Sequence, residues 1–385
     1  MKKIILLGAS GSIGMQSIDV VNHHQDEFNI IALSIGHNIN QLHEILKVCH
    51  PLDVCVSDEQ DMLKLIPQYP NIFFHHGEEG LCELCRLVNG DIVVNALVGF
   101  RGLIPSLETI KNHKILALAN KESLVAGGVL IKQALKDYKG TMVPIDSEHC
   151  AIFQCLQGNE KAAIKQLIIT ASGGSFRDKS RAELKNVTKQ QALNHPNWNM
   201  GGRITIDSAT MMNKGFEVME AHYLFDVPYD QIQVLIHRES VVHSMVQYID
   251  ESVMAQLGNA DMRLPIQYAL AYPHRIKLYE SEPLDLLKIA TLHFEPCDFE
   301  RYPLLALAYE AGKAQGNAGA IINAADESAV ALFLAGKITF LDIEEAIFAA
   351  YQAIPFIEKP TLEQLLQSDK EARIFVEQKW RGSFK

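Results

Sequence analysis

Residues 2–14, KKIILLGASGSIG, decide the fold of this chain. The apolar run before Gly8 predicts a buried strand, and the residues that follow the glycines predict a helix. Gly8, Gly11 and Gly14 stand at three-residue intervals between the two, where glycines permit a tight turn and a helix N-terminus offers free N–H groups to a pyrophosphate. The pattern predicts a dinucleotide-binding loop rather than an empty Gly-rich turn. The residues expected to contact the cofactor are Ser10, Gly11, Ser12 and Ile13.

Strand-like apolar runs alternate with helical stretches along the first part of the chain. The runs start at residues 2, 28, 53, 71, 91 and 114. Alternation of this kind predicts right-handed βαβ units on a parallel sheet, so the expected fold class is α/β with a Rossmann-like N-terminal sheet. We expect residues 1–145 to form the dinucleotide-binding domain.

The pattern changes in the remainder of the chain. Strand-like runs and one clear helix, near 215–225, predict a central α+β catalytic domain over 146–282. A segment rich in Pro and Phe, 283–311, is expected to connect it to a small C-terminal α-helical domain over 312–385, in which Thr339 and Asp342 form a predicted capping box. The strands expected in the central domain lie at 166–172, 203–209, 233–237 and 253–258.

Composition limits the classes of function. The chain has 385 residues, 48% of them hydrophobic and 21% charged, as in soluble proteins of more than one domain. The formal charge of −11 argues against a nucleic-acid partner, and no apolar run is long enough to predict a membrane span. Seven cysteines without framework spacing fit a reducing cytoplasm. We expect the one C-x-x-C pair, Cys82 and Cys85, to be packing residues.

The end of the second strand indicates which dinucleotide binds. NAD sites carry an Asp or Glu there for the ribose hydroxyls. This chain has Gly36, His37 and Asn38 instead, so a 2′-phosphate is better tolerated and NADP is favoured. Further on, Asn120, Lys121 and Glu122 follow another predicted strand. We expect Asn120 and Glu122 to contact the cofactor and Lys121 to hold substrate oxygens, although a plain helix start explains the same residues.

The stretch PIDSEHCAIF, residues 144–153, concentrates reactive side chains. In an extended segment Asp146 and Glu148 point the same way, and two converging carboxylates repel unless a cation lies between them. Oxygen ligands select Mg²⁺ or Mn²⁺. Glu217 is the leading third ligand, with Glu220 one turn further along a predicted helix.

Two alternative readings use the same sequence differently. Cys150 precedes a predicted helix, where the pKa of a thiol falls, and a reactive thiolate would suit a semialdehyde-type NADP dehydrogenase. An NADP-sensing regulator would bind the dinucleotide without turnover and would need no convergent acids. Ser147 with His149 is a weaker nucleophile candidate, because no G-x-S-x-G elbow surrounds the serine.

Seven motifs in order carry a family resemblance. They are GASGSIG, LANKESLV, PIDSEHCAIF, TASGGSFR, HPNWNMGGRITIDSATMMNKGFEVMEA, HSMVQY and ADMRLP. Together they resemble the 1-deoxy-D-xylulose 5-phosphate reductoisomerase family over about the first 275 residues. The resemblance implies an NADPH- and metal-dependent isomerisation and reduction of that phosphorylated ketose to 2-C-methyl-D-erythritol 4-phosphate, a step in isoprenoid biosynthesis. It also implies a homodimer.

The resemblance further implies roles for particular residues. Residues 195–203 correspond to a lid, in which Gly201 lies by the cofactor, and His243 lines the pocket. Two positions depart from the family pattern. Members of the family often have lysine at the position of His37 and asparagine at the position of Cys150. The implied metal ligands are Asp146, Glu148 and Glu217. The implied catalytic residues are these three with Lys121 and His195. The implied substrate-binding residues are Lys121, Ser147, Glu148, Ser172, His195, Trp198, Ser208, Asn213, Lys214 and Glu217.

Overall fold

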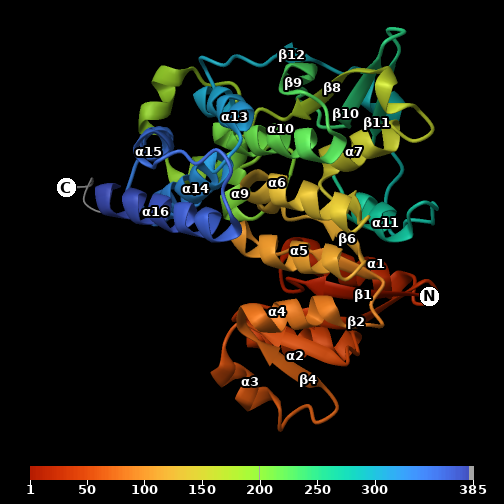
Figure 1. Ribbon diagram of the computed structural model, residues 1–385. Coiled ribbons are helices and arrows are strands. Elements are labelled where there is room, and N and C mark those ends of the chain that lie inside the picture. The colour runs from red at the N-terminus through yellow and green to blue at the C-terminus, as the bar shows by residue number, and fades with distance from the viewer. Residues whose placement is uncertain (199, 381–385) are drawn as a thin grey trace. The chain divides into compact units, whose positions relative to one another are not determined.

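The computed structural model describes residues 1–198 and 200–380 (Figure 1). Asn199, within the expected lid, and residues 381–385, within the expected C-terminal domain, lie outside the described residues. The chain forms two compact units, and the four segments expected from the sequence stay a prediction. Unit 1 comprises Met1–Ser123, Leu130–Cys150 and Asp261–Ser281, and unit 2 comprises Leu124–Val129, Ala151–Ala260 and Glu282–Lys385.

Unit 1 contains a seven-stranded parallel sheet in the order β4-β3-β2-β1-β5-β6-β7. The expected α/β class and parallel sheet are confirmed. The strand order reverses between β1 and β5, and ligands of such sheets bind at the carboxyl ends of the strands near this point. The strands are β1 (Lys2–Leu7), β2 (Phe28–Ser34), β3 (Asp53–Val56), β4 (Phe73–His76), β5 (Ile92–Asn95), β6 (Ile115–Leu118) and β7 (Thr141–Pro144).

Helices connect these strands, as βαβ units require. Cys85 on α4 packs in an apolar cluster with Ile5, Leu7 and Val93, and burial raises the pKa of its thiol to about 12. Cys82, also buried, has a pKa raised to about 11 by the same cause, so the packing role of this pair is confirmed. The connecting helices are α1 (Ser12–His23), α2 (Ile39–Val48), α3 (Glu59–Leu65), α4 (Gly77–Arg86), α5 (Leu103–Lys111) and α6 (Lys121–Asp137). Two further helices, α7 (Ser147–Cys155) and α11 (Arg263–Ala271), follow the last strand of the sheet. Residues 124–129 of α6 and 151–155 of α7 belong to unit 2.

Unit 2 contains a five-stranded mixed sheet in the order β11-β10-β8-β9-β12. β8 and β9 are parallel, and the other neighbours are antiparallel. The strands are β8 (Ile164–Ala171), β9 (Ile232–Ile236), β10 (Val242–Tyr248), β11 (Val253–Leu257) and β12 (Glu295–Pro296). The helices are α8 (Lys189–Ala192), α9 (Gly202–Thr210), α10 (Met212–Phe225), α12 (Leu286–Ile289), α13 (Pro303–Ala314), α14 (Ala318–Leu334), α15 (Phe340–Ala353) and α16 (Leu362–Trp380).

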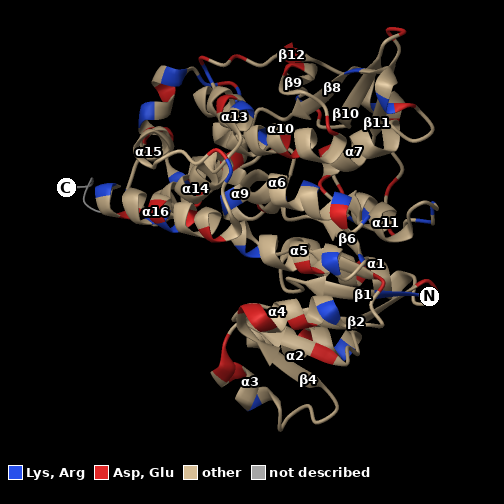
Figure 2. Ribbon diagram, in the orientation of Figure 1, with Lys and Arg blue, Asp and Glu red and all other residues tan. Residues whose placement is uncertain are grey.

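One apolar core joins this sheet to its helices. Phe340 at the start of α15 stacks edge-on against Phe176 at a centroid distance of 5.1 Å, and both side chains are buried. The expected helical C-terminal region is confirmed, including the capping box of Thr339 and Asp342. Among residues 1–198 and 200–380, no helix is long and apolar enough to cross a membrane. Basic and acidic positions are interspersed along the helices of each unit (Figure 2).

Two local predictions were wrong. The strand-like run 203–209, which contains the consecutive β-branched residues Ile204, Thr205 and Ile206, lies in helix α9. There Ile206 and Ala209, three residues apart on one helix face, are both fully buried, so tertiary packing outweighs the local preference. The segment around Ser147, expected to be extended, begins helix α7. In addition, α13 begins at Pro303, within the expected connecting segment.

Candidate active site

The glycine-rich loop lies between β1 and α1 at the sheet's switch point. Gly8 adopts φ +82°, a left-handed conformation that favours glycine. A side chain at Gly14 would place its Cβ 2.3 Å from the Gly8 carbonyl oxygen, so the turn closes only with glycine there. Gly11 and Ser12 are exposed at the start of α1, where the first N–H groups have no partner within the helix. The loop can therefore bind a pyrophosphate, and Ser10 and Ile13 flank it.

The end of β2 carries the residues expected to select the dinucleotide. Gly36, His37 and Asn38 follow Ser34, and His37 and Asn38 are exposed. Asn38 caps α2, because its Oδ1 accepts a hydrogen bond from the backbone N–H of Gln41 at 3.2 Å. No carboxylate occurs in this turn, which agrees with a site that accepts a 2′-phosphate.

Asn120 joins two turns at the carboxyl end of the same sheet. Its Oδ1 accepts the N–H of Ser123 at 3.1 Å, and its Nδ2 donates to the carbonyl oxygens of Leu97 and Gly99, both at 2.9 Å. Nδ2 also donates to Glu122 Oε2 at 2.7 Å. Asn120 is 1% exposed, so the structure gives this residue a supporting role beside its expected contact with the cofactor.

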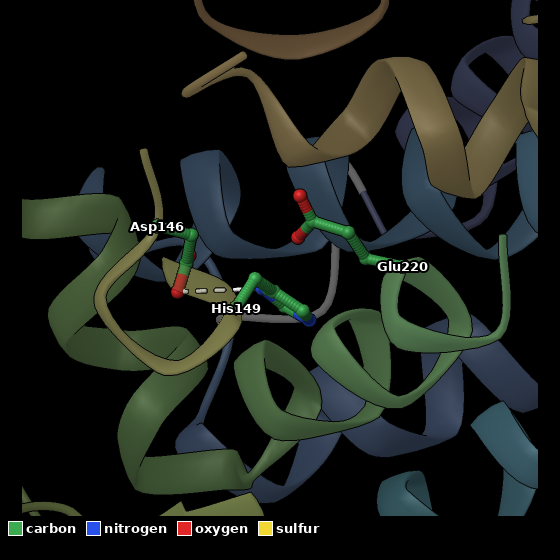
Figure 3. A group of neighbouring side chains, drawn as sticks. All are labelled: Asp146, His149 and Glu220. Carbon is green, nitrogen blue, oxygen red and sulfur yellow. Dashed lines mark ion pairs between the residues drawn. The ribbon is translucent and has the colours of Figure 1, made fainter. Parts of the chain in front are cut away.

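Lys121 and Asp146 meet at the carboxyl ends of β6 and β7. The Lys121 Nζ lies 2.7 Å from Asp146 Oδ2, and both side chains are almost entirely buried. His149, with no exposed side-chain surface, lies with its Nδ1 3.5 Å from Asp146 Oδ1 (Figure 3). Burial opposes ionisation of Asp146, but Lys121 and then His149 hold the pKa of its carboxyl well below the usual range. Asp146 is therefore a carboxylate at neutral pH.

Glu148 follows in the first turn of α7. Its backbone N–H donates to Asp146 Oδ1 at 3.3 Å, so Asp146 caps this helix. The Ser147 hydroxyl donates to Glu148 Oε2 at 2.5 Å. The three residues of the DSE motif therefore present oxygen atoms from a helix N-terminus, not from one face of a strand. Cys150 lies in the same turn and is 1% exposed.

Unit 2 pairs Ser172 with His195. The His195 Nδ1 accepts the backbone N–H groups of Asn197 at 3.2 Å and Trp198 at 2.9 Å, which places the proton on Nε2. Nε2 then donates to Ser172 Oγ at 2.9 Å. Burial, and then the charge of Arg177, lower the pKa of His195 to about 4, so the ring is neutral at pH 7.

The Ser172 hydroxyl is prepared to donate a hydrogen bond. Its oxygen accepts from His195 and also from the N–H of Gly174 at 3.2 Å. A hydroxyl with both lone pairs occupied can offer only its hydrogen, and an anionic oxygen is the natural acceptor. Gly174 has φ +70°, and a Cβ there would lie 2.4 Å from the Ser208 carbonyl oxygen. The structure thus brings the Ser172 turn against α9 at Ser208.

Helix α10 carries the remaining expected residues of unit 2. Asn213 and Lys214 lie in its first turn, and the Asn213 Nδ2 donates to Glu217 Oε1 at 2.5 Å. Lys214 forms an ion pair with Glu217 Oε2, and both side chains are buried. Glu220, one turn on, is fully buried. Amide, ammonium and carboxylate groups therefore share one helix face.

The remaining expected residues lie on the segment before α9. Trp198 is partly buried, with its ring 6.1 Å from that of His243. Gly201 is exposed and precedes α9 with φ −61°, a conformation open to any residue. Sequence reasoning missed Arg177 and Asn197, which contact this region. Only their position within the TASGGSFR and HPNWN motifs pointed to them.

The fold and these side chains define a class, Rossmann-type oxidoreductases that join a dinucleotide-binding sheet to an α+β unit. Three family models match the chain. They are 1-deoxy-D-xylulose 5-phosphate reductoisomerase over residues 4–128, the 1-deoxy-D-xylulose 5-phosphate reductoisomerase C-terminal domain over 142–225 and the DXP reductoisomerase C-terminal domain over 257–375. The chain belongs to the 1-deoxy-D-xylulose 5-phosphate reductoisomerase family.

Relatives with this name match along their full length. The protein of Geobacillus sp. strain WCH70 is 53% identical over 377 residues, 98% of this chain and 99% of its own. That of Bacillus subtilis strain 168 is 52% identical over 380 residues, with the same coverage. The Zymomonas mobilis enzyme, solved with NADPH, is 39% identical with a TM-score of 0.91 and full coverage of both chains. A DOX-P reductoisomerase solved with NADPH, fosmidomycin and magnesium is 39% identical, with a TM-score of 0.93, over 99% of this chain and 98% of its own.

Proposed function

We propose that this chain converts 1-deoxy-D-xylulose 5-phosphate to 2-C-methyl-D-erythritol 4-phosphate, using NADPH and a divalent metal ion. The observation that carries the proposal is the match of nearly the whole chain to relatives of that name, one of them solved with NADPH and magnesium. The phosphate loop of unit 1 and the acids on α7 and α10 supply the chemistry that this reaction needs.

The donor groups suit a hard divalent ion. We propose that Asp146, Glu148 and Glu217 bind Mg²⁺ or Mn²⁺, because they offer only carboxylate oxygens. A second set, Asp146 with His149 and Glu220, includes an imidazole and suits such an ion less well. When bound, the ion supplies Lewis-acid polarisation of the substrate oxygens, and NADPH supplies the hydride.

The side chains of this protein then have the following proposed tasks. In unit 1, Lys121 donates to a substrate oxygen and Ser147 to a substrate hydroxyl. In unit 2, Ser172 donates its hydroxyl hydrogen to the substrate phosphate, and the neutral His195 holds the serine oxygen in place. Trp198 supplies apolar cover that excludes water. The further groups proposed for the phosphate are Ser208, Asn213 and Lys214.

The cofactor residues remain part of the proposal. Ser10, Gly11, Ser12 and Ile13 would bind the pyrophosphate, because the loop is tight and its helix N-terminus is exposed. The turn after β2 would receive the 2′-phosphate through His37 and Asn38, with Gly36 leaving open space. The other residues proposed to contact NADPH are Asn120, Glu122 and Gly201.

The test is NADPH oxidation by the purified protein with 1-deoxy-D-xylulose 5-phosphate, with Mg²⁺ or Mn²⁺, and then with excess EDTA. Metal-dependent oxidation that yields the branched polyol phosphate is expected. Turnover that ignores EDTA and stops with a thiol reagent would move the chemistry to Cys150, as a semialdehyde-type dehydrogenase requires. Tight NADPH binding without turnover would favour the regulator. Burial of the Cys150 side chain, 1% exposed, argues against the thiol route.

Assembly and location are proposed on separate grounds. We propose a homodimer, supported by apolar side chains on the edge strand β11, where Val253 is 49% and Met254 47% exposed. Light scattering of the purified chain checks this, and a monomeric mass at micromolar concentration contradicts it. We propose a cytoplasmic location, supported by seven reduced cysteines. Cell fractionation checks the location.

A further inference from the structure

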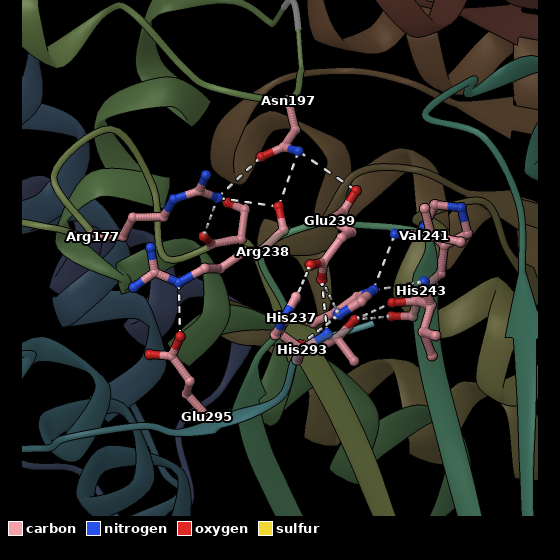
Figure 4. Close-up of polar contacts among 12 residues, drawn as sticks. Arg177, Asn197, His237, Arg238, Glu239, Val241, His243, His293 and Glu295 are labelled. Atoms are coloured by element: carbon pink, nitrogen blue, oxygen red, sulfur yellow. Dashed lines mark hydrogen bonds and ion pairs between the residues drawn. The ribbon is translucent and has the colours of Figure 1, made fainter. Parts of the chain in front are cut away.

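Arg177 connects three segments that are distant in the sequence. Its Nη1 lies 3.2 Å from the carbonyl oxygen of Ser172, 3.3 Å from Asn197 Oδ1 and 3.1 Å from the carbonyl oxygen of Arg238 (Figure 4). The first acceptor belongs to the turn after β8, the second to the 195–198 segment and the third to the turn between β9 and β10. One guanidinium nitrogen is thus a shared donor to all three.

Asn197 adds a second set of contacts between two of these segments. Its Nδ2 donates to the carbonyl oxygens of Arg238 at 3.0 Å and Glu239 at 3.5 Å, while its Oδ1 accepts from Arg177. The amide orientation follows from its partners, because a reversed amide would put N–H groups against the guanidinium and oxygen against two carbonyls. Asn197 therefore fits this place as an amide and not as a carboxylate.

The turn that receives Asn197 is itself held firmly. The buried His237 accepts the N–H groups of Val241 at 3.2 Å and Val242 at 3.1 Å on its Nε2, so its Nδ1 carries the proton and donates to the His293 carbonyl at 2.9 Å. Arg238 forms ion pairs outward, with Asp178 at 2.5 Å and Glu295 at 2.7 Å. These contacts fix the conformation of the β9–β10 turn, which the 195–198 segment contacts through Asn197.

We propose that Arg177 and Asn197 are positioning residues that hold the 195–198 segment on the β9–β10 turn and so fix the His195 ring against Ser172. The proposal rests on the proposed function, in which Ser172 and His195 bind the phosphate of the substrate. The backbone N–H of Asn197 donates to the His195 Nδ1. The side chain of the same residue bonds Arg177 and the carbonyl oxygen of Arg238. Arg177 also disfavours a charged imidazole at His195, which preserves the tautomer that the serine contact needs.

Trp198 offers a direct report on this segment. The chain has two tryptophans, and Trp380 is buried in the core at 7% exposure. In a Trp380→Phe background, acrylamide quenching of Trp198 fluorescence in the ligand-free protein measures how closely the segment is held. The variants are Asn197→Ala, Asn197→Ser and Arg177→Ala. The matched control is Asn194→Ala, an exposed asparagine three residues before Asn197.

We expect the quenching constant to rise about twofold or more in each Asn197 variant and in Arg177→Ala, and to stay at the parent value in Asn194→Ala. KM for the ketose phosphate should rise about tenfold, KM for NADPH less than twofold and kcat change less than threefold. The quenching constant and the KM for the ketose phosphate of the Arg177→Ala/Asn197→Ala double variant should not exceed those of the poorer single variant, because both residues act through the same set of contacts. Arg177→Lys should show a smaller rise in the quenching constant and in KM than Arg177→Ala.

Quenching and KM within the range of the Asn194→Ala control would overturn the proposal, as would fully additive effects of the two variants. A merely structural role predicts a lower melting temperature with equal losses for both substrates, and that result would also overturn it. If the parent protein does not turn over the ketose phosphate, the proposed function fails. The quenching of the ligand-free variants still decides whether Arg177 and Asn197 hold the segment.

Discussion

A buried carboxyl behind α9 gives a prediction with a definite sign. Asp326 on α14 has no exposed surface and lies with its Oδ2 3.6 Å from Arg203 Nη2. Burial and then the charge of Asp207 raise the pKa of Asp326 well above its usual range, although Arg203 acts in the opposite direction. Arg203 and Asp207 belong to α9, which also carries Ser208. The perturbation is Asp326→Asn, which keeps the shape and removes the titration.

The expected size follows from proton linkage. An aspartate in the unfolded chain loses its proton near pH 3.9, whereas Asp326 in the folded protein keeps its proton to higher pH. Above about pH 4 the folded state therefore binds the extra proton, and its stability falls by about 1.4 kcal/mol per pH unit until the folded pKa is reached. The asparagine variant lacks this slope. A weaker interaction of the asparagine with Arg203 changes the stability by a constant that does not depend on pH.

The assay compares melting temperatures of the parent and Asp326→Asn in one buffer series from pH 5 to pH 7. About 1.4 kcal/mol corresponds to roughly 3–6 °C for a cooperative unit of 150–250 residues. The difference in melting temperature should therefore move in favour of the variant by that amount for each pH unit below the folded pKa of Asp326. Titrating groups that do not interact with Asp326 are common to both proteins and cancel. A difference that is flat, or that moves in favour of the parent as pH rises, would refute the reasoning.

Four further perturbations test the proposed site. Gly14→Ala should weaken NADPH binding more than tenfold, because its Cβ would lie 2.3 Å from the Gly8 carbonyl oxygen, and NADPH fluorescence titration measures it. His37→Lys should raise the ratio of kcat/KM for NADPH over NADH several-fold, since it adds a permanent charge at the exposed end of β2; an unchanged ratio would remove His37 from the 2′-phosphate site. Cys150→Ser should keep kcat within about threefold, and complete loss of activity in a folded variant would favour the thiol mechanism. EDTA in excess should abolish turnover, and added Mg²⁺ or Mn²⁺ should restore it.

The parallel sheet and the tight glycine-rich loop were predictable because their signals are local. The expected strands at residues 2, 28, 53, 71, 91 and 114 all occur, since each buried parallel strand must be an apolar run. The loop follows from three glycines, one of which needs a positive φ and another a close backbone approach. These requirements act within one turn of chain and leave a pattern in the residues.

The two wrong expectations arose where tertiary packing outweighs local preference. Residues 203–209 have the composition of a strand, but burial of Ile206 and Ala209 on one side stabilises a helix. The DSE motif was expected to be extended, but Asp146 caps α7. In both cases the residue types of the segment do not reveal which side chains from elsewhere in the fold contact it.

The sequence by itself determined the Rossmann-like sheet, the glycine-rich loop and the residue types of the proposed metal and phosphate ligands. Only the tertiary structure decided the protonation states of those ligands and which neighbouring side chains hold them in place. Lys121 reaches Asp146 across two strand ends, and Arg177 meets Asn197 and Arg238 from three separate turns. A local pattern records what one segment needs for its own conformation. Contacts between distant segments depend on how the whole chain packs, and no short stretch of residues contains that information.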